Sequence, residues 1–126
     1  MNEFNPGFQD EGTYTPDKLH AGDHPIRSEG VTILAGQVLT RGALLGIVTV
    51  DGKAVLSLAA AQDGSEEPWG ILGEDIDATA GDQNSFAYIA GDFNQTAMTF
   101  GTGHTPDSVR EGLRDKSIYL VDDIPA

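Results

Sequence analysis

The sequence predicts a mainly β protein: a compact β-rich barrel or sandwich with one short C-terminal helix and a disordered N-terminal arm. Three observations predict this class. From Val31 onward, short apolar runs alternate with turns rich in glycine and aspartate. Residues 105–115 carry the start signals of a helix. Residues 1–30 hold three prolines and several glycines, and no strand period persists there. We therefore divide the chain into an arm, 1–30, and a β-rich domain, 31–126.

The domain is expected to consist of short strands joined by turns. Asp51-Gly52 is a strong hairpin signal, and Gly91-Asp92 predicts a second turn. The apolar run Ala43–Val50 indicates a strand buried on both faces. The expected strands are 31–34, 37–39, 43–50, 53–60, 69–76, 84–90, 93–100 and 117–121.

One helix is expected near the C-terminal end. Thr105 suits the N-cap, Pro106 the first helical position and Asp107 the first turn. Val109 and Leu113 mark one apolar face. The helix should end near residue 115, and a glycine at position 112 weakens it.

Composition excludes several classes of function. The chain has 126 residues, enough for one domain, and a net charge of −13, which would repel a nucleic-acid backbone. It has no cysteine, so neither disulfides nor thiol chemistry is available. The first residues lack the basic start and apolar run of a signal peptide, and no apolar stretch is long enough to span a membrane. We expect a protein made in the cytoplasm, with no nucleic-acid or membrane partner.

Candidate chemistry is sparse. His20 and His24 have the spacing of two metal ligands on a helix, but Gly22 and Pro25 argue against a helix there. His104 is interpreted as a loop residue. No nucleophile elbow, phosphate-binding loop or dinucleotide fingerprint is present. We therefore expect no enzyme activity, no metal and no cofactor.

Two features suggest binding instead. Apolar residues are scattered among the polar ones of the arm, which gives it something to bury against a partner; the alternative is a solvated tail. Trp69, which follows Pro68 at the start of an expected strand, is either a core residue or an interface anchor. The apolar residues of the arm are Phe4, Phe8, Tyr14, Leu19 and Ile26.

Several segments resemble the head decoration proteins of tailed bacteriophages. They are Ala21-Gly-Asp-His-Pro-Ile-Arg27, Val31–Thr49, Gly70–Asp77 and Ala90–Asn94. The order of features also agrees: a proline-bearing arm, a β body, an acidic turn before a short helix and a closing apolar strand. The resemblance covers about residues 14–121, and the first thirteen fall outside it.

The resemblance implies a role on the virion. Such proteins sit as homotrimers on the outer surface of the capsid, at three-fold and quasi-three-fold positions. They bind the major capsid protein after the shell expands during DNA packaging and reinforce it against internal pressure. Their arm is disordered in the free protein and orders on the capsid by adding β-structure to the coat protein. On this basis we expect a protein made in the host cytoplasm and placed on the capsid surface.

The arm supplies the candidate contacts with the capsid, and the β-rich domain supplies those between copies. For the trimer contacts, which the sequence does not place, Pro68 and Trp69 are the candidates. For contact with the capsid we select Tyr14, Thr15, Pro16, Leu19 and Ile26.

Two other classes remain open at this point. A lipoyl- or biotinyl-type carrier domain needs a modified lysine at a hairpin tip, and Lys53 follows the Asp51-Gly52 turn. A small sugar-binding or other ligand-binding β domain, or a cryptic hydrolase, would use Asp75 and Asp77, although acidic turn residues are the simpler interpretation.

Overall fold

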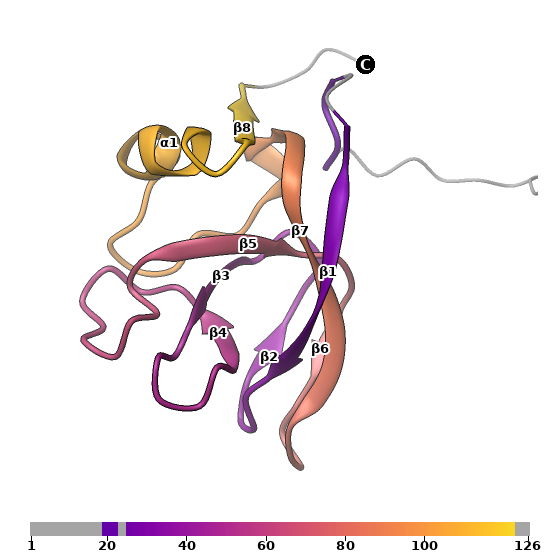
Figure 1. Ribbon diagram of the computed structural model, residues 1–126, viewed down its shortest axis with the longest axis vertical. Coiled ribbons are helices and arrows are strands. Elements are labelled where there is room, and N and C mark those ends of the chain that lie inside the picture. The colour runs from indigo at the N-terminus through magenta and orange to yellow at the C-terminus, as the bar shows by residue number, and fades with distance from the viewer. Residues whose placement is uncertain (1–18, 23–24, 123–126) are drawn as a thin grey trace, which may run out of the picture.

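The computed structural model describes residues 19–22 and 25–122, and the central feature is a closed five-stranded barrel. The barrel strands, in spatial order, are β1 (Arg27–Ile33), β4 (Ala54–Leu56), β3 (Leu44–Ile47), β5 (Pro68–Leu72) and β7 (Gln83–Asn94). Strand β7 pairs with β1, which closes the barrel (Figure 1). The predicted mainly β fold is confirmed.

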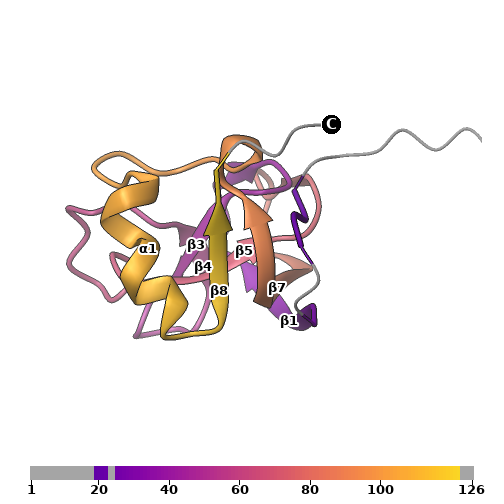
Figure 2. The same cartoon turned by 90° about the horizontal axis from the view of Figure 1, so that it is seen from above.

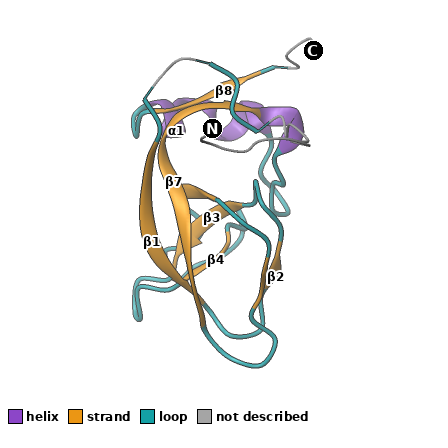
Figure 3. Ribbon diagram, turned by 90° about the vertical axis from the view of Figure 1, so that its right-hand side faces the viewer, coloured by secondary structure: helices purple, strands orange, loops and turns teal. Residues whose placement is uncertain are grey.

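Two smaller units complete the fold. Strands β2 (Val38–Leu39) and β6 (Ile76–Asp77) form a short antiparallel ladder. Strand β8 (Ile118–Val121) pairs in parallel with the end of β7, beside helix α1 (Pro106–Arg114) (Figure 2). Figure 3 shows α1 and β8 together at one end of the barrel, with β2 towards the other end. Within the described residues, no helix is long and apolar enough to cross a membrane.

The helix matches its prediction closely. The Thr105 hydroxyl accepts a hydrogen bond from the Ser108 amide at 3.1 Å, and the Ser108 hydroxyl accepts one from the Thr105 amide at 2.9 Å. These reciprocal bonds form a capping box and satisfy two backbone donors at the start of the helix. Val109 and Leu113 are buried, as expected from their spacing.

The Asp51-Gly52 turn also joins two strands as predicted. Strands β3 and β4 pair antiparallel around it, and Gly52 adopts a φ of +71°, which a side chain would disfavour. Both strands are shorter than expected. Strand β4 ends at Leu56, and one further bond in the same register follows, from the Ser57 amide to the carbonyl of Leu44.

The predicted turn at Gly91-Asp92 is wrong. Residues 83–94 form one continuous strand, and the expected strand 93–100 is replaced after Asn94 by a 3₁₀ turn, η1 (Gln95–Ala97). Partners on both sides hold the strand extended through the Gly-Asp pair. The Gly91 amide donates to the Ser117 carbonyl at 3.0 Å, and the Asp92 carbonyl accepts from the Ala21 amide at 3.0 Å. Tertiary pairing here overrides the local turn preference.

The core has two parts. One lies inside the barrel and includes Ile33, Leu45, Leu72 and Ala87. The other fills the space between the barrel, α1 and β8; its buried members are Leu19, Leu44, Ile71, Phe93, Val109, Leu113, Ile118 and Leu120. The second cluster fixes the helix and β8 to the barrel end.

A glycine in the middle of β3 provides a first test of this packing. Gly46 lies so close to the backbone of Ser65 that an added Cβ would overlap the Ser65 carbonyl. Gly46→Ala is therefore expected to lower the free energy of unfolding by about 1–3 kcal/mol. The matched control is Gly112→Ala, because a Cβ at this helical position meets nothing within 4 Å and should stabilise the protein by about 0.5–1 kcal/mol. Urea denaturation measures both; an unchanged midpoint for Gly46→Ala would contradict the packing.

Candidate functional site

The structure reaches two of the five residues predicted to contact the capsid. Tyr14, Thr15 and Pro16 lie outside the described residues. Ile26 is 51% exposed and immediately precedes β1, so its side chain is available to a partner.

Leu19, also predicted to contact the capsid, lies in the core of the domain instead. Its side chain is only 2% exposed and belongs to the core cluster between the barrel and α1. A side chain already buried in its own domain has no apolar surface left to offer a partner. The proposed end of the arm at residue 30 also differs from the structure, because β1 begins at Arg27 and pairs with β7 from there. The folded body therefore includes Leu19 and the start of β1.

Both ends of the described chain meet at one residue of β7. The Asn94 amide donates to the Leu19 carbonyl at 2.7 Å. In the β7–β8 ladder, Asn94 is also paired with Val121. The chain thus enters and leaves the body at the same end of the barrel, where β8 lies along β7 (Figure 3).

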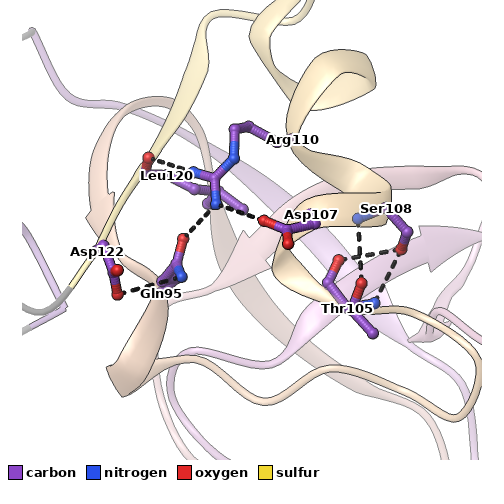
Figure 4. Close-up of polar contacts among 7 residues, drawn as sticks. All are labelled: Gln95, Thr105, Asp107, Ser108, Arg110, Leu120 and Asp122. Carbon is purple, nitrogen blue, oxygen red and sulfur yellow. Dashed lines mark hydrogen bonds and ion pairs between the residues drawn. The ribbon is translucent and has the colours of Figure 1, made fainter.

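An arginine on α1 ties this end together (Figure 4). Arg110 donates to the Leu120 carbonyl at 2.9 Å, to the Gln95 side-chain oxygen at 2.9 Å and to Asp107 at 3.2 Å. Gln95 in turn donates to Asp122 at 3.4 Å. One guanidinium therefore joins the helix to the ends of β7 and β8. Nothing in the sequence indicates this role of Arg110 beyond its placement on the helix.

A groove of about 300 Å³ lies between α1 and the loops that precede β5 and α1. Pro68, one of the two predicted trimer contacts, lines it. Trp69, the other, is half-buried and packs against the cluster inside the barrel. The groove residues are Ala59, Glu66, Glu67, Pro68, Gly103, His104, Ser108, Val109 and Gly112.

His104 in this groove has a defined partner. Its Nε2 lies 3.0 Å from the hydroxyl of buried Ser57, and that hydroxyl donates its proton to the Ser65 carbonyl at 2.7 Å. Ser57 must then accept from His104, so Nε2 carries a proton. The histidine cannot act as a base toward Ser57 in this arrangement, and the pair is structural.

Asp75 and Asp77, the residues considered for a ligand or catalytic site, and the neighbouring Glu74 bond to groups of the domain itself. Asp75 accepts the Arg41 amide at 2.8 Å, and Glu74 accepts the Ser85 hydroxyl at 2.7 Å. Asp77 accepts the hydroxyl and the amide of Thr79, and these hydrogen bonds lower its pKa. In the described part of the chain, no three His, Asp or Glu side chains gather as metal ligands would.

Lys53, the candidate for a carrier-type modification, is held by an ion pair. Its Nζ lies 2.6 Å from Asp82, at the end of the β3–β4 hairpin. The hydrogen bond to Asp82 and the charge of that carboxylate raise the pKa of Lys53. A carrier domain needs a lysine whose amine is free to be modified, and the ion pair with Asp82 holds this amine against the domain.

The same pair gives a prediction of pH dependence. The hydrogen bond from Lys53, followed by that from the Ala35 amide, lowers the pKa of Asp82 below its usual 3.8. A carboxyl whose pKa is lower in the folded state stabilises that state above its unfolded pKa and loses this effect as the pH falls through its folded pKa. We expect the urea midpoint to fall as the pH drops below 3.8, and Asp82→Asn to flatten that fall. Glu29→Gln, which changes an exposed carboxylate on β1, is the control; equal slopes for the two variants would contradict the prediction.

The fold and its surfaces define a class of protein: a small acidic β-barrel whose described polar side chains bond largely within the domain and which carries a groove beside α1. The family model of the bacteriophage lambda head decoration protein D matches residues 8–116, which is most of the chain. The chain therefore belongs to this family, and the resemblance noted in the sequence is confirmed. No curated protein matches the chain.

Membership of the family supplies the general role. The family consists of head decoration proteins of phages, which are structural proteins of the capsid. The chain is accordingly a capsid-binding structural protein of the virion surface.

Proposed function

We propose that this protein binds the outside of the expanded phage head as a homotrimer at three-fold and quasi-three-fold positions. It contacts the major capsid protein there and stabilises the shell against the pressure of packaged DNA. The observation that carries the proposal is the family match over residues 8–116. The protein would be made in the host cytoplasm and would add to the head from there.

The architecture supports an arm mechanism. Residues 19–21 lie antiparallel to the end of β7, anchored by the Leu19 side chain, so the point at which the preceding residues join the barrel is fixed. An extended segment can add as a strand to an exposed sheet edge of the coat protein. Ordering the segment costs free energy, which makes one arm a weak binder. Three arms on one trimer raise the effective concentration of each and so strengthen binding.

Selective binding to the expanded shell would then stabilise it. A ligand that binds only one of two states shifts the equilibrium towards that state. We propose that Tyr14, Thr15, Pro16 and Ile26 make the shell contacts. Leu19 instead serves as the anchor that holds the arm to the barrel. Pro68 and Trp69 remain our proposed trimer contacts, with Pro68 presented in the groove beside α1.

The test is co-sedimentation with shells of the same phage, before and after expansion. The full chain is compared with a chain that begins at Leu19, which keeps the buried anchor and all of β1. We expect the full chain to bind expanded shells only, and the shortened chain to lose binding while it keeps its urea midpoint. Binding by both would discard the arm mechanism. No binding of the full chain to either shell would discard the decoration role.

The residues of the arm are tested by a triple alanine variant at Tyr14, Thr15 and Pro16. Its matched control carries alanine at Asn2, Glu3 and Asn5, outside the stretch we assign to the contact. Loss of shell binding in the first variant alone would support the assignment, and equal loss or equal retention in both would overturn it.

A further inference from the structure

The groove beside α1 has the lining that a basic side chain of a neighbouring protein would need. Glu66 and Glu67 supply carboxylates at its border, and Pro68, Ala59 and Val109 supply apolar surface. A long cationic side chain packs its methylenes on apolar groups while its charged head meets carboxylates. The chemistry of the groove therefore favours arginine or lysine as occupant.

His104 also lines the groove, and its Nε2 is already bonded to the Ser57 hydroxyl at 3.0 Å. Both carboxylates already have a partner in the same chain, because Lys116 lies 3.5 Å from Glu67 and the Gly64 amide donates to Glu66 at 2.9 Å. The Glu67 side chain is nevertheless 71% exposed, so it can accept a second cation.

One described basic residue is suited to be that cation. Within residues 19–22 and 25–122, Arg27 is the basic residue whose side chain makes no hydrogen bond or ion pair. It is exposed at the start of β1, next to exposed Ile26. The other described basic residues are engaged: Arg41 with Gly73 and Tyr88, Lys53 with Asp82, Arg110 with Gln95, Arg114 with Glu111 and Lys116 with Glu67.

The two surfaces lie on different sides of the molecule. In both Figure 1 and Figure 2, β1 is on the right and α1 is on the left. A contact between two different surfaces of identical chains is head-to-tail, and it closes into a ring when the rotation between copies allows it. A homotrimer with three-fold symmetry is such a ring.

We propose that Arg27 of one copy inserts into the Glu66–Glu67 groove of the next copy and that three such contacts close the trimer. The inference rests on the trimer of the proposed function and names its contacts. Charge favours a second copy as the source of the cation. With a net charge of −13, copies of this chain repel one another, so their association needs local pairing of opposite charges.

Thiol cross-linking tests the contact directly, because the chain has no cysteine of its own. The variant Ser28→Cys/Ala59→Cys keeps Arg27, Glu66 and Glu67 and places one thiol beside the arginine and the other in the groove lining. It is treated with a bifunctional maleimide. The matched control is Ser28→Cys/Glu74→Cys, which moves the second thiol to an exposed site outside the groove. Both are examined as concentrated free protein and on expanded shells.

We expect covalent dimers and trimers from the groove variant, at least about tenfold more than from the control. Equal products from both variants, or none from the groove variant in either sample, would overturn the proposal. A product that joins position 28 to the coat protein would also overturn it, because the neighbouring Arg27 would then serve the shell. If the protein failed to bind shells, the decoration role would fall, while cross-linking of the free protein would still decide the contact.

Charge exchange gives a second readout. Arg27→Glu and Glu67→Arg should each weaken self-association by at least about tenfold, as loss of one partner of a close interfacial charge pair does. The double exchange restores an opposite pair and should recover most of the loss in sedimentation velocity and in occupancy on shells. Additive loss in the double variant would overturn the proposal. The urea midpoint of each variant separates loss of contact from loss of folding.

Discussion

Phe93→Ala is expected to lower the free energy of unfolding by about 3–5 kcal/mol, the range for truncating a fully buried phenylalanine. Phe93 has no exposed surface and is one of the largest buried side chains of the second core cluster. Its ring centroid lies 5.2 Å from that of His20 and 5.7 Å from that of Tyr88, so it joins the entering chain to β7. Truncation would leave a cavity where the helix, β8 and the barrel meet.

Urea denaturation of Phe93→Ala measures this loss, with Val50→Ala as the control. Val50 is 93% exposed, so its truncation should change the midpoint little. Similar midpoints for the two variants would show that the second cluster does not hold the helix and β8 to the barrel. A loss confined to helical signal in circular dichroism would show instead that the barrel folds without α1.

Leu19→Ala is expected to cost about 2–5 kcal/mol of folding stability. The side chain is 2% exposed and packs in the cluster between the barrel, α1 and β8, although Leu19 is the first residue that the structure describes. Ile26→Ala is the matched comparison, because this residue is also apolar and close to the arm but 51% exposed. Its stability should change little.

The two variants should also differ in binding to expanded shells. Leu19→Ala, measured under conditions where it remains folded, should keep most of its binding, whereas Ile26→Ala should lose part of it. The reverse pattern, with Leu19→Ala as stable as the parent chain but unable to bind, would return Leu19 to the list of shell contacts and contradict its placement in the core.

Features with strong local signals could be predicted from the sequence. The helix was foreseen because Thr105 and Pro106 define its start by themselves. The hairpin was foreseen because Gly52 meets a turn requirement that few other residues meet. These features depend on neighbours in sequence, so one chain is enough to reveal them.

Features set by distant partners could not be predicted. The local sequence around Gly91 predicts a turn. The Ser117 carbonyl and β8, both distant in sequence, hold this residue in a strand instead. Leu19 is a lone apolar residue in a segment without period, so nothing local distinguishes a core anchor from a surface contact. Closure of the barrel likewise rests on pairing of β1 with β7, more than fifty residues apart for most pairs.

The two surfaces of the proposed contact could be predicted from the sequence only in part. Pro68 was selected beside a possible anchor, Trp69, and does line the groove. The other side of our proposed contact, Arg27, is not distinguished in the sequence from the chain's other basic residues. That its side chain has no partner among residues 19–22 and 25–122 is seen only once the partners of the other basic residues are known.

The meeting of both chain ends at Asn94 has a mechanical consequence. Strand β7 is the longest in the barrel and is paired with β1, β5 and β8 as well as with residues 19–21. A tensile load applied through the arm enters at Leu19 and passes into β7. From there it is shared among several ladders at once. A molecule anchored at this point would resist being pulled from a surface through the shear strength of its whole barrel rather than through one peeling strand.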